Sequence, residues 1–124
     1  FLVLALPIPL QKILAEEIKT LASNVSICEK LTIHSLKSLI SKVDLVIGPD
    51  TGPTHIAWAL NVSSITLFGP TPGFRNAYIT DINRIIESKS TVNPHKINKN
   101  DYSIKDIKVD DIVKISNTLL KLNK

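Results

Sequence analysis

The sequence predicts an α/β fold in which an open parallel sheet carries helices on both faces. Short apolar runs of strand length alternate along the chain with segments whose apolar residues recur at helical spacing. This alternation favours parallel strands joined by right-handed crossovers. The chain has 124 residues, of which 44% are hydrophobic and 21% are charged, an ordinary globular composition. We therefore expect a single compact domain over residues 1–124.

The first part of the chain contains two expected strands and two expected helices. Continuous apolar residues predict a strand over Phe1–Leu6, and alternating apolar positions predict another over Val25–Cys28. An amphipathic helix is expected between them, near Gln11–Ala22. Thr32 is suited to cap a second helix that ends near Lys42. The buried stripe expected on that second helix comprises Ile33, Leu36, Leu39, Ile40 and Val43.

The middle of the chain continues the alternation. Leu45–Ile47 predicts a third strand, and the Gly, Pro and Asp residues of the segment 48–52 predict a turn after it. Pro53 suits the first position of a third helix because it has no amide hydrogen to leave unpaired. Ser64–Phe68 predicts a fourth strand, and Gly69–Gly73 predicts a loop.

The last third of the chain has a weaker pattern. Arg84–Ile86 indicates a fifth strand, and Thr91–Ser103, rich in Asn, Lys and Pro, is typical of a surface loop. Asp110 or Asp111 can start a closing helix. The chain starts at Phe1 and contains no methionine, so we expect it to be a piece of a longer protein.

Charge and cysteine content exclude some function classes. The formal charge of +4 suits an anionic ligand, but the lysines are scattered singly and aromatic residues make up only 5%. We therefore expect no nucleic-acid binding. Cys28 is the only cysteine, which excludes a disulfide within the chain and favours a reducing, cytoplasmic setting.

The loop after the third expected strand is the first candidate binding site. In open α/β sheets, ligands bind outside the carboxyl ends of the strands. Here the segment leads into a helix whose free amides and positive dipole end attract phosphate. Gly52 lets backbone approach a diphosphate and can adopt positive φ, while Thr51 and Thr54 offer hydroxyl donors. An ordinary turn and helix cap would explain these residues equally well.

The charged and aromatic residues of this segment also have two interpretations each. Asp50 either accepts amides at the helix start or accepts sugar hydroxyls. His55 is expected to be a neutral imidazole that donates one hydrogen bond to a phosphate or sugar oxygen, or else it packs between helix and sheet. Trp58 is expected in the core, and His34 and His95 on the surface.

Two segments together resemble the lipopolysaccharide heptosyltransferase family. Its pattern is Asp, Thr or Ser, Gly, two residues, His, one residue, Ala, one residue, Ala, Leu, followed after a strand by Phe-Gly-Pro-Thr. Asp50–Leu60 and Phe68–Thr71 match both parts. Overall length and the following loop are most similar to heptosyltransferase I. The resemblance implies the second half of a GT-B enzyme, in which two Rossmann-like domains face each other across a cleft.

The resemblance also implies a function. Such enzymes transfer L-glycero-D-manno-heptose from ADP-heptose to Kdo in the lipopolysaccharide inner core, with inversion, at the cytoplasmic face of the inner membrane. The missing amino-terminal domain would bind the Kdo-lipid A acceptor and supply an aspartate as general base. No cofactor and no metal are implied, association with the membrane would be peripheral, and this chain alone would be inactive.

Site residues carry over position by position. Thr51, Gly52 and Pro53 would hold the diphosphate through backbone amides, although Pro53 has none. Asp50 would face the heptose hydroxyls, and His55 would favour departure of ADP. The adenine pocket would be lined by Leu31. Where the family usually has Gly, three residues and Glu for the ribose, this chain has Pro7 and Gln11.

Two rival functions remain open. Another GT-B enzyme that uses a UDP-sugar would need the same sheet edge, glycine loop and helix dipole. A non-enzymatic α/β nucleotide-binding module would use Asp50 only as a helix cap and would bury His55.

Overall fold

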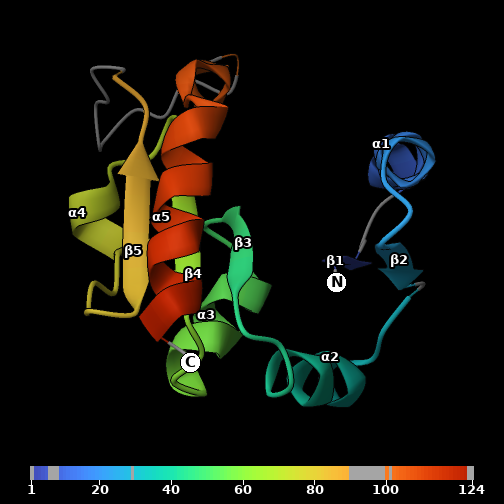
Figure 1. Cartoon of the computed structure of the whole chain (residues 1–124). Helices are drawn as coiled ribbons and strands as arrows, with labels where there is room; N and C mark the ends of the chain where they lie inside the picture. The colour runs from blue at the N-terminus through green and yellow to red at the C-terminus, as the bar shows by residue number, and fades with distance from the viewer. Residues whose placement is uncertain (1, 6–8, 29, 90–99, 101, 123–124) are drawn as a thin grey trace. The chain divides into compact units, whose positions relative to one another are not determined.

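The structure, a computed structural model, describes residues 2–5, 9–28, 30–89, 100 and 102–122 (Figure 1). The chain divides into two compact units, Phe1–Leu36 and Lys37–Lys124, and each is described by itself. The organisation of residues 1–124 as a single domain therefore stays a prediction.

The first unit is a β-α-β arrangement. Strand β1 (Leu2–Ala5) pairs in parallel with β2 (Val25–Cys28), and helix α1 (Pro9–Leu21) connects them. The predicted strands are confirmed, and β2 has the predicted bounds. The helix starts two residues before the predicted Gln11, at Pro9, a residue that suits the first turn because its missing amide hydrogen would be unpaired there anyway.

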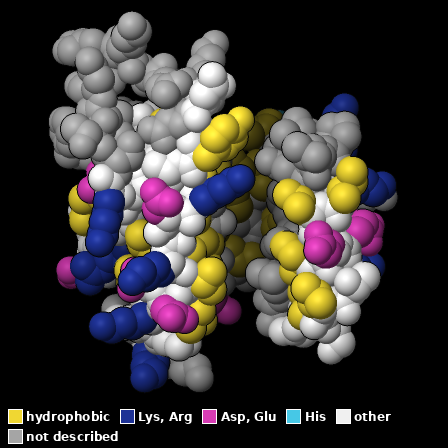
Figure 2. All heavy atoms as spheres, turned by 90° about the horizontal axis from the view of Figure 1, so that it is seen from above, with side chains coloured by type: hydrophobic (Ala, Val, Ile, Leu, Met, Phe, Trp, Pro, Cys, Tyr) yellow, Lys and Arg dark blue, Asp and Glu magenta, His cyan; other side chains and the backbone are white. Residues whose placement is uncertain are grey.

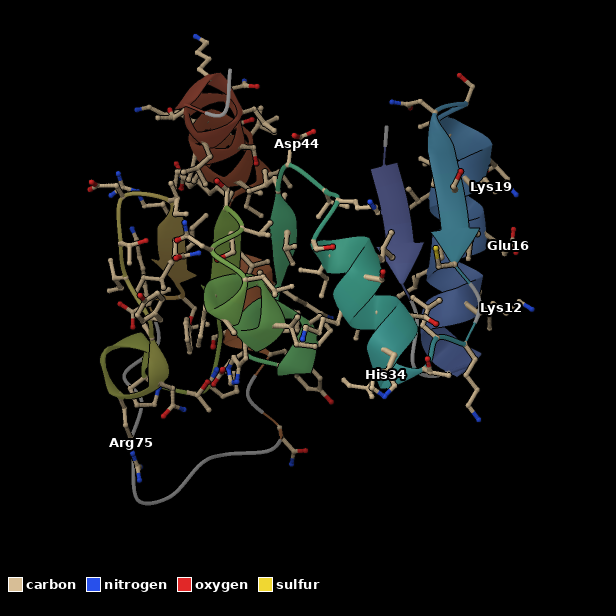
Figure 3. All side chains as sticks on the ribbon, turned by 90° about the horizontal axis from the view of Figure 1, so that it is seen from below. Lys12, Glu16, Lys19, His34, Asp44 and Arg75 are labelled. Atoms are coloured by element: carbon tan, nitrogen blue, oxygen red, sulfur yellow. The ribbon has the colours of Figure 1, made fainter. Side chains whose placement is uncertain are left out.

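Helix α1 exposes much of its apolar surface within this unit. Ala15 is buried, whereas the larger aliphatic side chains are exposed. Figure 2 shows hydrophobic side chains at the surface of this unit beside acidic ones, and in Figure 3 Lys12, Glu16 and Lys19 project outward from the helix. None of the described helices is long and apolar enough to cross a membrane. The exposed aliphatic residues of α1 are Ile13, Leu14, Ile18 and Leu21.

Helix α2 (Ile33–Ile40) follows the predicted cap. The Thr32 hydroxyl accepts a hydrogen bond from the Ser35 amide at 3.2 Å, which satisfies one of the free donors of the first turn. Ile40 is buried as predicted, but the prediction for Ile33 was wrong, because its side chain is exposed in the first turn, where few neighbours can cover it. His34 is exposed on the same helix, as expected (Figure 3). His95 lies outside the described residues.

The second unit contains a three-stranded parallel sheet in the order β3-β4-β5. These strands are β3 (Val46–Pro49), β4 (Ser64–Phe68) and β5 (Asn83–Glu87), so the predicted third, fourth and fifth strands are confirmed. Helix α3 (Gly52–Ala59) connects β3 to β4, and the short helix α4 (Gly73–Asn76) follows β4.

Helices cover both faces of this sheet. The closing helix α5 (Val109–Leu122) lies in front of β4 in Figure 1, and α3 lies behind it. Side chains alternate between the faces of a strand. Ser64 of β4 faces α3, because it accepts a hydrogen bond from the Trp58 indole at 3.1 Å, and the next residue, Ile65, is fully buried, as is Leu119 of α5. This core holds the end of β3 and the start of α3 in place.

The structure corrects two loop predictions. Gly48 and Pro49 belong to β3 and not to the turn. Proline is tolerated there because β3 is an edge strand of its sheet, and a Cβ on Gly48 would lie 3.3 Å from the Thr54 methyl carbon. The 3₁₀ turn η1 (Ser103–Asp106) starts at the end of the predicted loop 91–103, of which residues 91–99 and 101 lie outside the described residues.

Candidate functional site

The candidate site begins where β3 ends. Asp50 follows the strand directly, and Thr51 is the N-cap of α3 with extended backbone, φ −145° and ψ 171°. Gly52 is therefore the first helical residue, followed by Pro53. Pro53 has no amide hydrogen, and the Thr51, Thr54 and His55 amides are bonded within the turn, which leaves the Gly52 amide without a partner inside the helix. The positive end of the helix dipole lies at the same place. Such a helix start suits an anion, and binding of a diphosphate here stays a prediction.

Thr54 stabilises this loop through hydrogen bonds made by its buried side chain. Its side chain is fully buried, and its hydroxyl accepts the Thr51 amide at 3.2 Å. The hydroxyl also lies 2.7 Å from the Thr51 carbonyl and 3.0 Å from the Pro49 carbonyl, so its single hydrogen is satisfied within the loop. We expected Thr54 to offer its hydroxyl to a ligand; the geometry instead gives it a structural role, and it engages the Thr51 amide as well.

Gly52 keeps the outer side of the loop open. A Cβ built on Gly52 would have no heavy atom within 4 Å, and none of the described glycines has positive φ. Gly52 therefore does not use the positive φ that glycine can adopt. This open space lets a ligand approach the backbone at the helix start, whereas a side chain there would occupy the position of the ligand.

Asp50 and His55 form a close pair on the exposed side of the same turn. His55 Nε2 lies 2.6 Å from Asp50 Oδ1, and the side chains are 51% and 18% exposed. The interpretation that His55 packs between helix and sheet is thereby excluded. A neutral imidazole has a single N–H, which here points at Asp50. To donate to a ligand as well, His55 must carry a second proton on Nδ1 or release Asp50.

Trp58 supports His55 from one turn further along α3. The two rings stack with centroids 4.4 Å apart and 22° between their planes, while the indole N–H is held by Ser64. Trp58 thus packs toward the sheet but is only half-buried, whereas we expected it in the core. It also orients the imidazole, a role that was not predicted from the sequence. The signal was present in the sequence, because residues three apart lie on the same face of a helix.

Asn76 is the other residue that the sequence did not reveal. Its side-chain amide donates to Asp50 Oδ2 at 3.2 Å from the last position of α4, 26 residues further along the chain. Helix α4 follows the loop that contains the Phe-Gly-Pro-Thr motif. The segment that follows the second motif therefore reaches the Asp50 carboxylate of the first motif. Within the described residues, no group of three or more His, Cys, Asp and Glu side chains could hold a metal ion.

Leu31, Gln11 and Pro7 belong to the first unit, so their predicted role beside this cluster stays a prediction. Leu31 is half-buried just before α2. The side chain of Gln11 and the whole of Pro7 lie outside the described residues. The residues that the structure does bring together are Asp50, Thr51, Gly52, Pro53, Thr54 and His55, joined by Trp58 and Asn76.

Comparison with known proteins identifies the family. The profile of glycosyltransferase family 9 (heptosyltransferase) matches residues 7–104. The chain belongs to this family. It is 44% identical over 93 residues to lipopolysaccharide heptosyltransferase 1 of Campylobacter coli, covering 74% of this chain and 27% of that protein. It is also 36% identical over 56 residues to lipopolysaccharide heptosyltransferase 1 of Pseudomonas aeruginosa, covering 44% of this chain and 16% of that protein.

A solved structure confirms the fold class. E. coli heptosyltransferase WaaC with ADP superposes with a TM-score of 0.75 at 14% sequence identity, covering 94% of this chain and 33% of that chain. The α/β prediction and the predicted family are thus both confirmed. This family 9 chain spans about a quarter of the length of the Campylobacter coli relative and about a third of the length of the solved E. coli chain.

Proposed function

We propose that the full-length protein is a lipopolysaccharide heptosyltransferase and that residues 50–55 form part of its donor site. The donor would be ADP-heptose, and the acceptor would be Kdo of the inner core, carried on lipid A. The observation that carries this proposal is the exposed Asp50–His55 pair beside an open helix start. Family membership and the ADP named with the solved relative support the choice of donor.

The loop offers separate places for the diphosphate and the sugar. The Gly52 amide and the dipole of α3 suit a phosphate oxygen, and the absence of a side chain at Gly52 leaves room for it. Asp50 would accept hydrogen bonds from heptose hydroxyls. A carboxylate beside a diphosphate would repel it, but here both oxygens of Asp50 are turned toward His55 and Asn76. This orientation reduces the repulsion.

In the proposed reaction, the bond between the anomeric carbon and the diphosphate breaks while a Kdo hydroxyl forms the new glycosidic bond from the opposite face. The electron pair of the broken bond leaves with ADP, and the proton of the Kdo hydroxyl passes to a general base outside this chain. His55 would stabilise the leaving diphosphate by donating a hydrogen bond from a protonated Nδ1, because Nε2 is engaged by Asp50. Such stabilisation of developing charge is generally worth a few kcal/mol, roughly 3.

The proposal includes a place of action. The protein would work at the cytoplasmic face of the inner membrane, in peripheral association with it, where its lipid-linked acceptor lies. The formal charge of +4 supports this setting, because the membrane surface is acidic. No cofactor and no metal are proposed, and residues 1–124 alone are expected to be inactive.

Titration of the full-length protein with ADP and with UDP tests the proposal. Calorimetry should show that ADP binds at least about tenfold more tightly, a difference of about 1.4 kcal/mol. The purified protein should also transfer heptose from ADP-heptose to Kdo-lipid A. Equal or tighter binding of UDP would contradict the heptose donor and would favour a GT-B enzyme that uses a UDP-sugar.

A further inference from the structure

The carboxylate of Asp50 is held from two sides, by side chains that come from different helices. His55 of α3 lies 2.6 Å from Oδ1, and the Asn76 amide of α4 lies 3.2 Å from Oδ2. We propose that Asn76 is a positioning residue, which fixes the plane of the Asp50 carboxylate so that it receives the sugar of the donor. This inference rests on the donor site proposed above.

A second contact is needed because one contact does not fix a carboxylate. Rotation about the terminal torsion of an Asp side chain has broad minima, so the bond to His55 alone would let Oδ2 move. His55 is stacked on Trp58, but it contacts only Oδ1 and so does not restrain Oδ2. Asn76 removes this freedom by binding the other oxygen. Each carboxylate oxygen has a further lone pair, so both can still accept a sugar hydroxyl.

Asn76 is suited to this role because α4 is tied to the sheet. The Gly73 amide at the start of α4 donates to Glu87 Oε1 of β5 at 2.7 Å, and the Ala77 amide closes the helix on the Gly73 carbonyl at 2.8 Å. A Cβ on Gly73 would lie 2.5 Å from the same Glu87 oxygen, so a side chain here would displace that carboxylate. Its neighbour Arg75 projects outward from α4 in Figure 3. The sheet therefore sets where Asn76 lies.

A positioning role differs measurably from direct contact with the sugar. If Asn76 acts only through Asp50, its amide matters only while Asp50 is present. If Asn76 binds a hydroxyl itself, its loss adds to the loss of Asp50. The effect should also be confined to the heptose, because ADP lacks the heptose hydroxyls that Asp50 is proposed to bind.

The experiment measures donor kinetics and ADP binding for Asn76→Ala in the full-length protein. We expect kcat/KM for ADP-heptose to fall about tenfold, the usual effect of losing one hydrogen bond to a charged group. Affinity for ADP should stay within about twofold of the wild type, and the melting temperature should not change. Asn76→Asp, which puts a second carboxylate beside Asp50, should lose more activity. Asn117→Ala, at an exposed position of α5, is the matched control.

The double variant Asp50→Ala with Asn76→Ala decides the mechanism. It should be no less active than Asp50→Ala alone. Additive losses would overturn the positioning role, and so would a wild-type rate in Asn76→Ala. Equal losses of ADP affinity and ADP-heptose turnover would also overturn it, because they indicate a general structural role. If Asp50→Ala itself matched the wild type, the proposed donor site would fail, an outcome distinct from failure of Asn76 alone.

Discussion

Two hydrogen-bonded networks lie next to each other in the second unit, and they differ in burial. The buried network joins β4 to β5: Asn83 is fully buried and donates to Ser64 Oγ at 2.9 Å and to the Val62 carbonyl at 3.0 Å. It also accepts the Thr80 hydroxyl at 2.9 Å. The exposed cluster consists of Asp50, His55 and Asn76. Trp58 connects the two, because its indole N–H reaches Ser64 while its ring stacks on His55.

This difference in burial implies that one network contributes to stability and the other to function. A buried polar group that loses its partner costs about 1–3 kcal/mol, because water cannot replace the partner. A contact between partly exposed polar side chains contributes about 0–1 kcal/mol, because water competes with it. The buried network should therefore hold the fold, whereas the exposed cluster can exchange its internal bonds for bonds to a ligand at little cost. Trp58 links the two networks, because its bond to the buried network sets where its ring lies, and this ring positions His55 of the exposed cluster.

The largest expected effect tests the exposed cluster. Asp50→Ala in the full-length protein should reduce kcat/KM for ADP-heptose by roughly a hundredfold, because it removes charge-assisted bonds to the sugar, each worth about 1.5–3 kcal/mol. The free energy of unfolding should change by less than about 1 kcal/mol. Asp106→Ala, exposed on η1, serves as the control. A large loss of stability together with near-normal transfer would reverse the assignment.

The next effect tests the buried network. Asn83→Ala should lower the free energy of unfolding by about 2–3 kcal/mol, because it leaves buried partners of the side chain unsatisfied. Chemical denaturation of the full-length protein measures this, with Asn117→Ala as the exposed comparison. Below the unfolding transition, transfer should fall less than in Asp50→Ala. An unchanged denaturation midpoint would show that the network does not hold the fold.

The smallest expected effect tests the role of Trp58, which connects the two networks. Trp58→Phe keeps an aromatic ring beside His55 but loses the hydrogen bond to Ser64, so we expect a loss of about 1 kcal/mol in stability. Transfer should fall only about threefold, because the stack of about 0.5–1.5 kcal/mol is weakened and not removed. A loss as large as that of Asp50→Ala would mean that the indole N–H contacts the donor directly.

The strands could be predicted from the sequence because local signals mark their ends. Ser64–Phe68 has the predicted bounds: it is a continuous run of strand-forming residues closed by Gly69-Pro70. The end of β3 was harder to predict, because glycine and proline are typical of turns. Gly48 and Pro49 nevertheless pair with β4 as strand residues.

The candidate site could be predicted only in part. Asp50 and His55 lie five residues apart in a helix start, so their proximity follows from local geometry. Asn76 is 26 residues further on, and its contact depends on how α4 is tied to Glu87, which no local pattern reveals. The role of Thr54 was misjudged because composition cannot tell which side of a turn a hydroxyl occupies.

The central claim is that the exposed cluster is functional and not structural, and a pair of histidine variants tests it most directly. His55→Ala and the control His34→Ala, exposed on α2, would be compared in the full-length protein for heptose transfer and melting temperature. We predict that His55→Ala lowers kcat by at least about thirtyfold, or about 2 kcal/mol, at an unchanged melting temperature, while His34→Ala changes neither. Unchanged transfer with a lower melting temperature in His55→Ala would contradict the claim.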